Sequence, residues 1–277
     1  MKTILVPTDF SNNANNALKY ANDFAKAINN KIVLLHSYLP LVGKYNMISG
    51  IVAEDIAIQK KSSEKKLEKV SSKYVKVPSS HLVKIGDTID EIIDAAQKSK
   101  SQLIIMGTHG ASGLKRILFG SNTSDVISKS NIPVLAIPQR YRFKKINTIV
   151  YATDLNNTIN ELKHIIPIAK QLNATIEVLN LNYIYNKNED KKLLLEKKIK
   201  TLSYKKIKLI EQKATIEQTM IEQIKKYLVK RKPELLVMFP EDKAWFDKLF
   251  ISSKTEELAN QIKLPLLSIR KKSVKSK

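Results

Sequence analysis

The chain of 277 residues has no cysteine, so it has no disulfide, no thiol nucleophile and no thiolate metal site. It also has no apolar run near the roughly 18 residues that a membrane-spanning helix needs. The first strand-like run meets Pro7 and Asp9 too early for a signal peptide. These absences exclude a disulfide-stabilised scaffold and a membrane span, and we expect a cytoplasmic protein with no membrane partner.

Arginine is scarce in a strongly basic chain. The formal net charge is +22, yet only five residues are arginine. Residues 1–140 hold 19 Lys+Arg and 11 Asp+Glu, and residues 141–277 hold 29 and 15, which gives +8 and +14. A nucleic-acid groove usually combines lysine with arginine and aromatic residues. We therefore expect solvated, lysine-rich helices, and we keep binding of nucleic acid or another polyanion as the less favoured alternative.

Glycine is scarce and concentrated in one segment. Four of the seven glycines lie between residues 107 and 120, and none follows Gly120. Glycine lets a backbone approach a ligand closely. A helix that begins at Ser121 would present free N–H groups and the positive end of its dipole to an anion. Residues 106–123 therefore predict a phosphate-binding loop.

Apolar strands and amphipathic helices alternate on both sides of this loop. We expect strands at residues 3–6, 31–36, 81–85, 103–106 and 133–137, and helices at 13–28, 51–74, 87–98 and 121–129. This alternation predicts an α/β fold with an open, mostly parallel, doubly wound sheet. Ligands bind such sheets beyond the carboxyl ends of the strands, where Asp9 and the glycine loop would both lie.

The same pattern restarts after a charged connector at residues 140–145. Residues 146–154 echo residues 1–9, and residues 235–239 and 264–269 align with the fourth and fifth strands at an offset of 132. The remaining expected elements are strands at 175–182 and 206–210 and helices at 159–172, 190–202 and 215–230. Pro167 should kink its helix or mark a late start. We expect domains at 1–140 and 146–271, followed by a basic tail at 272–277.

The second copy has lost the glycines of the loop. Opposite Gly107, Gly110, Gly113 and Gly120 stand Phe239, Asp242, Trp245 and Ser252. Bulky side chains and a carboxylate both oppose an anionic ligand. We therefore predict one phosphate site per chain, in the first copy.

The loop carries a recognisable spacing. Gly107-Thr-His-Gly110, nine residues and then Gly120-Ser121 resemble the G-x2-G-x9-G-[S/T] pattern of ATP-binding universal stress proteins. The likeness covers residues 1–138, and the second copy shares the framework only. It implies two Rossmann-like doubly wound domains, each with a five-stranded, mostly parallel sheet flanked by helices. It further implies that their last strands, residues 133–137 and 265–269, pair to form an internal pseudo-dimer.

The resemblance also implies an adenine-nucleotide site. Residues at the ends of the first, second and fourth strands would border the nucleoside or turn the chain, and the start of the following helix would donate to the phosphates. In chain order these residues are Pro7, Thr8, Asp9, Ser37, Met106, Gly107, Thr108, His109, Gly110, Gly120, Ser121, Asn122 and Thr123. The implied ligand is ATP, with or without Mg²⁺, and AMP, ADP and a cyclic nucleotide are alternatives.

A nucleotide-binding regulator or sensor of the stress response is the function that this resemblance implies, with a homodimer as an alternative assembly. No general base or pair of metal-binding carboxylates is evident near the loop, and no Gly-x4-Gly-Lys-[Ser/Thr] motif occurs. A slow ATPase is therefore the alternative, and we assign no catalytic residue. The four histidines lack metal-ligand spacing, so we expect no metal site, and we expect His36 and His81 to be packed or hydrogen-bonded.

Overall fold

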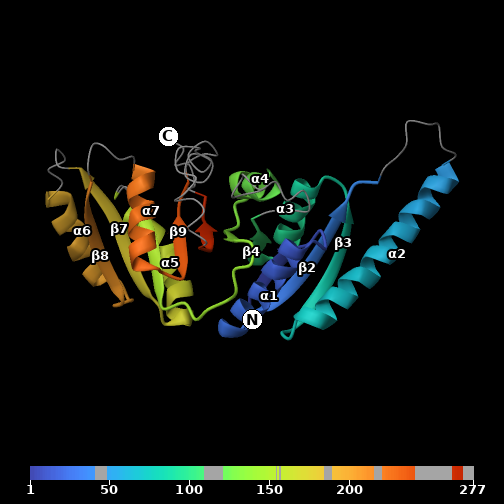
Figure 1. Ribbon diagram of the computed structural model, residues 1–277, viewed down its shortest axis with the longest axis horizontal. Coiled ribbons are helices and arrows are strands. Elements are labelled where there is room, and N and C mark those ends of the chain that lie inside the picture. Colours follow the sequence, from blue (N-terminus) through green and yellow to red (C-terminus); the bar gives the residue numbers. More distant parts are fainter. Residues whose placement is uncertain are drawn as a thin grey trace. The chain divides into compact units, whose positions relative to one another are not determined.

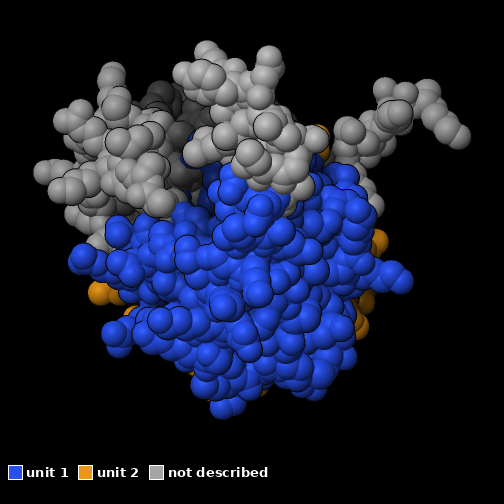
Figure 2. Space-filling view, turned by 90° about the vertical axis from the view of Figure 1, so that its right-hand side faces the viewer, with its two compact units in different colours: residues 1–143 blue, residues 144–277 orange. Residues whose placement is uncertain are grey.

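A computed structural model of the chain describes residues 1–40, 49–108, 121–153, 155, 157–183, 189–214, 220–240 and 264–270. The chain divides into two compact units, residues 1–143 and residues 144–277. Figure 2 shows unit 1 in blue and unit 2 in orange. Within the described residues, no helix is both long enough and apolar enough to cross a membrane.

Unit 1 alternates strands and helices along its described residues (Figure 1). Its elements are β1 Thr3–Pro7, α1 Asn12–Ala27, β2 Lys31–Tyr38, α2 Ser49–Tyr74, β3 Ser79–Ile85, α3 Thr88–Lys98, β4 Ser101–Gly107, α4 Ser121–Lys129 and β5 Val134–Ile137. The described strands lie in the order β3-β2-β1-β4-β5, and all neighbours run parallel. The chain winds outward from β1 to β3 and then crosses to β4, so the switch in strand order lies between β1 and β4.

The central strands of unit 1 are apolar because helices cover both faces of a doubly wound sheet. Ile4, Leu5, Val6, Ile104 and Ile105 are fully buried. Helix α1 packs on β1 and β4 and contacts α2, whereas α3 packs on β2 and β4 and contacts α4. The two helix pairs thus enclose the sheet and leave its carboxyl edge as the place where loops can form a site.

Unit 2 repeats this architecture. Its elements are β6 Thr148–Thr153, α5 Thr158–Leu172, β7 Thr175–Tyr183, α6 Glu189–Thr201, β8 Ile207–Ala214, α7 Met220–Arg231, β9 Leu235–Met238 and β10 Leu266–Ser268. The described strands lie in the order β10-β9-β6-β7-β8, again all parallel. Counted outward from the first strand of each unit, this is the order found in unit 1. The α/β fold with parallel sheets predicted from the alternation is therefore confirmed.

The two units share backbone details as well as topology. Left-handed backbone conformations occur at Phe10 and Leu155, with φ of 62° and 68°. Two further pairs match, Asn29 with Asn173 at 52° and 56°, and Lys100 with Lys232 at 51° and 50°. Residues other than glycine rarely adopt this backbone conformation. Its recurrence at offsets of 145, 144 and 132 residues supports the internal alignment made from the sequence.

Some local expectations need correction. Helix α5 begins at Thr158 and runs through Pro167, so proline marks no late start. His81 is exposed on β3 instead of packed. The connector at residues 140–145 also packs on α1. The Phe143 ring lies 5.3 Å from that of Tyr20, and the Asn16 side chain donates to the Tyr141 carbonyl at 3.1 Å.

Candidate functional site

The residues predicted to bind a ligand gather at the switch point of unit 1, beyond the carboxyl ends of β1 and β4. Thr8 and Asp9 directly follow β1, and Gly107 is the last residue of β4. In open α/β sheets the crevice outside this edge is where ligands bind. The observed strand order therefore places the two sequence signals, 98 residues apart, on neighbouring strands.

The turn after β1 is held by its own side chains. The Thr8 amide donates to the Leu35 carbonyl on β2 at 2.8 Å, and the Thr8 hydroxyl accepts from the Phe10 amide at 3.0 Å. The Asp9 carboxylate accepts from the Ser11 amide at 2.9 Å while Asp9 stays exposed. This turn presents a carboxylate to solvent at the sheet edge, with the left-handed backbone of Phe10 stabilised by the Thr8 hydroxyl.

The end of β4 lies against the start of α1. Helix α1 is capped by Ser11, whose hydroxyl accepts from the Ala14 amide at 3.1 Å. A Cβ atom added at Gly107 would lie 3.1 Å from the Asn13 carbonyl oxygen. Such a distance is tighter than ordinary van der Waals contact. Glycine is therefore favoured here by the close approach of the α1 backbone.

The same strand end is tied to α4. The Thr123 hydroxyl donates to the Gly107 carbonyl at 2.8 Å, and the Thr108 amide donates to the Ile137 carbonyl on β5 at 3.0 Å. Ser121 and Asn122, the first two residues of α4, are exposed. The helix thus begins beside the end of β4, with its first two residues open to solvent.

His36 is a residue of this region that the sequence did not mark as part of the site. Its Nδ1 lies 2.8 Å from the Thr8 carbonyl oxygen, and its ring centroid lies 4.4 Å from that of Phe10. A carbonyl only accepts, so Nδ1 must carry the proton. The expectation that His36 is packed or hydrogen-bonded is confirmed. Its position directly after the apolar run that ends at Leu35 was the sequence signal that could have placed His36 in the site.

Most of the predicted residues lie at one edge of the sheet, but several of them are buried or hydrogen-bonded to the backbone. Met106 and Thr108 are 7% and 3% exposed, and the Thr108 amide and the Thr123 hydroxyl already have backbone partners. Ser37 is half-buried in β2, next to His36. Asp9, Ser121 and Asn122 remain accessible to a ligand. His109, Gly110 and Gly120 lie outside the described residues. Within the described part of the chain, no group of three or more His, Asp or Glu could hold a metal ion.

At the corresponding edge of unit 2 an aromatic residue replaces glycine. Phe239 follows β9 as Gly107 ends β4, and it is 8% exposed. Its ring packs edge-on against Tyr151 with centroids 5.6 Å apart. The Tyr151 hydroxyl donates to the Glu161 carboxylate, and both residues are buried. This strand end is therefore filled by side chains. Asp242, Trp245 and Ser252 lie outside the described residues.

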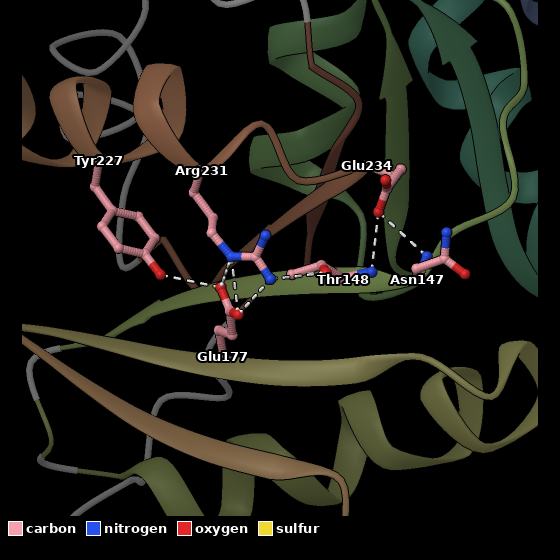
Figure 3. A network of polar contacts seen from close by, with 6 residues as sticks. All are labelled: Asn147, Thr148, Glu177, Tyr227, Arg231 and Glu234. Carbon is pink, nitrogen blue, oxygen red and sulfur yellow. Dashed lines mark hydrogen bonds and ion pairs between the residues drawn. The ribbon is translucent and has the colours of Figure 1, made fainter.

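Unit 2 also contains a polar network around the buried Glu177 carboxylate, near the amino ends of its strands (Figure 3). The Arg231 Nε and Nη2 atoms donate to the Glu177 carboxylate at 2.8–3.0 Å, and the Tyr227 hydroxyl donates to it at 3.0 Å. Burial, followed by the hydrogen bond to Glu177, raises the pKa of Tyr227 to about 12. These contacts attach α7 to β7. They lie away from the carboxyl edge, so we assign them to stability.

Comparison with known proteins agrees with this description. Residues 1–138 match the Universal stress protein family. The chain is 33% identical to the universal stress protein MJ0531 of Methanocaldococcus jannaschii over 144 residues, covering 49% of this chain and 81% of the relative. It is 31% identical to the universal stress protein MJ0577 of the same organism over 155 residues, covering 50% of this chain and 96% of the relative.

A solved structure extends the likeness in fold to both units. The crystal structure of a universal stress protein from Archaeoglobus fulgidus covers 97% of this chain and 98% of its own, with a TM-score of 0.71 and 18% identity. At this identity the match concerns the fold alone. The family match over unit 1 and the two relatives above 30% identity lead to one conclusion: the chain belongs to the universal stress protein family.

Proposed function

We propose that unit 1 binds one adenine nucleotide, ATP, at the carboxyl ends of β1 and β4, and that the chain acts as a nucleotide-dependent regulator. The observation that carries this proposal is the position of Gly107. Its missing side chain permits the contact with Asn13 of α1, while its carbonyl accepts from Thr123 of α4. The ends of β1 and β4 and the start of α4 therefore meet at the switch point, where nucleotides bind related sheets.

The phosphate groups would lie at the start of α4. Ser121 and Asn122 are exposed there, and the first N–H groups of a helix have no partner within the helix. The helix dipole adds a partial positive charge at the same end. The glycine spacing through Gly110 and Gly120 supports the same assignment, because a loop with little side-chain bulk lets phosphate oxygens approach the backbone.

The nucleoside would lie toward β1. The Asp9 carboxylate is exposed at the end of this strand and can accept a hydrogen bond from a ribose hydroxyl or an adenine amino group. Pro7, Thr8 and Ser37 border the same edge, and Met106 offers an apolar contact from β4. These residue types suit a ligand with a polar sugar and an apolar base.

One site per chain is part of this proposal. In unit 2 the position of Gly107 is taken by Phe239, which packs against Tyr151. A ring at this place removes the close backbone approach that Gly107 allows. We propose that unit 2 is a degenerate copy of the same domain, which supports unit 1 and does not bind nucleotide.

A charge change at the first residue of α4 tests the proposal. Ser121→Asp should weaken ATP binding by roughly tenfold or more, because a carboxylate would face the phosphates. The same carboxylate favours the helix start, so folding should not suffer. Asn157→Asp, before the first residue of α5 in unit 2, is the matched control and should leave ATP affinity unchanged. Saturable binding that Ser121→Asp does not weaken would overturn the proposed site.

A further inference from the structure

His36 connects the ends of β1 and β2 next to the proposed nucleoside position. Regular pairing of these strands ends at Pro7 and Leu35. Beyond it, the Thr8 amide donates to the Leu35 carbonyl at 2.8 Å, and the His36 ring donates from Nδ1 to the Thr8 carbonyl at 2.8 Å. Both backbone polar groups of Thr8 are thus held by β2, immediately before Asp9.

The His36 ring also supports the far side of the same turn. It lies 4.4 Å from the Phe10 ring and 6.0 Å from the Tyr38 ring, both measured between centroids. The Phe10 carbonyl accepts from the Asn15 side chain at 3.3 Å. Asp9 therefore stands between two residues, Thr8 and Phe10, that His36 contacts directly.

Unit 2 keeps two features of this turn without a histidine. Leu155 has the same left-handed backbone as Phe10, and the Thr153 hydroxyl accepts from its amide at 3.1 Å. The strand register pairs Thr153 with Asn180, which takes the place of His36 in unit 2. Among the described residues, the Asn180 side chain makes no hydrogen bond to Thr153, whose hydroxyl lies 3.2 Å from that of Thr158. The backbone conformation of Leu155 and its hydrogen bond to Thr153 therefore form without the histidine ring.

We propose that His36 is a positioning residue of the nucleotide site, which holds the segment from Thr8 to Phe10 so that the Asp9 carboxylate meets the nucleoside. This inference rests on the proposed function. Its support is that His36 and Phe10 occur together in the unit with the glycine loop, whereas unit 2 has Asn180 and Leu155 and keeps the left-handed backbone at Leu155. Preorganisation of this kind reduces the ordering that a ligand must otherwise impose on a loop.

Two substitutions separate the two contacts of His36. His36→Phe keeps a ring against Phe10 but removes the donor to the Thr8 carbonyl. His36→Asn removes the ring but keeps an amide nitrogen near the position of Nδ1. If the hydrogen bond positions the turn, His36→Phe should weaken ATP binding about fivefold to tenfold, the range of one lost hydrogen bond. His36→Asn should remain within about threefold of the wild type.

Titration calorimetry of the full chain with ATP and with inorganic triphosphate tests the inference. ATP affinity should fall in His36→Phe while triphosphate affinity stays unchanged, because the turn faces the nucleoside. Asn180→Leu in unit 2 is the matched control and should change neither. Thermal unfolding monitors the fold. If His36→Phe folds poorly, His36→Leu, which also lacks the donor, should weaken ATP binding without weakening triphosphate binding.

The outcomes separate this inference from the proposed function. If the wild type does not bind ATP, the proposed function fails and the positioning role fails with it. If the wild type binds ATP and His36→Phe binds it equally well, only the positioning role is overturned. Equal losses for ATP and triphosphate would also overturn it, because they would indicate general damage to unit 1.

Discussion

The Thr123 hydroxyl donates a 2.8 Å hydrogen bond to the Gly107 carbonyl and thereby ties the first turn of α4 to the end of β4. Thr123 is 3% exposed, so its hydroxyl is shielded from solvent and relies on this bond. Thr123→Val should lower the free energy of unfolding by about 1–2 kcal/mol and weaken ATP binding. Urea unfolding measures the first effect. Thr123→Ser, which keeps the hydroxyl, should retain most of both properties, and equal behaviour of the Val and Ser variants would contradict this role.

Side-chain bulk at Gly107 should push β4 and α1 of unit 1 apart. A Cβ there would lie 3.1 Å from the Asn13 carbonyl, so β4 and α1 must move apart to admit it. We expect Gly107→Val to destabilise the chain by about 1–3 kcal/mol, with a smaller loss for Gly107→Ala. ATP affinity should fall in the same order. Unfolding and ATP titration of both variants test this, and a valine variant that matches the wild type in both would refute the close-approach argument.

Several parts of the fold were predictable because their signals are local. The helix expected at residues 121–129 is α4 Ser121–Lys129, and the strand expected at 133–137 is β5 Val134–Ile137. Apolar periodicity and a small polar residue at a helix start are properties of neighbouring residues. The match of strand order between the units followed from the internal repeat.

The contacts within the candidate site were not predictable in the same way. His36 meets Thr8 across 28 residues, and Gly107 approaches Asn13 across 94. Such contacts depend on which strands become neighbours, and the hydrophobic periodicity of the sequence does not reveal the strand order. The Glu177–Arg231 pair is similar, since its partners lie 54 residues apart.

The Glu177–Arg231 pair should show strong coupling. Glu177 is 4% exposed, and its carboxylate accepts from both Arg231 and Tyr227. Arg231→Ser should cost about 1–3 kcal/mol, because it removes the cation from a buried carboxylate, while the Arg231 side chain itself is 44% exposed. The aligned positions in unit 1 are Val33 and Ser99, so the double variant Glu177→Val, Arg231→Ser should regain much of this loss. A double-mutant cycle from urea unfolding tests the coupling, and additive losses would contradict it.

Tyr227 should make unit 2 sensitive to alkaline pH. Burial and the bond to Glu177 raise its pKa to about 12, above the ordinary value of 10.0. The folded state therefore holds this proton more tightly than the unfolded state. The resulting stability is fully present below about pH 10 and is lost as the pH rises toward 12. Tyr227→Phe should thus lose less stability between pH 9 and about pH 11 than the wild type. Parallel pH dependences in urea unfolding would argue against a raised pKa.

The number of nucleotide sites is the most direct measure of the central claim. Titration calorimetry of the full chain with ATP should give saturable binding at one site per chain, because unit 1 has Gly107 where unit 2 has the buried Phe239. Gly120→Val should abolish this binding, because the glycine spacing predicts that phosphate approaches the backbone at this position. Absence of saturable binding, or two equivalent sites per chain, would contradict the account.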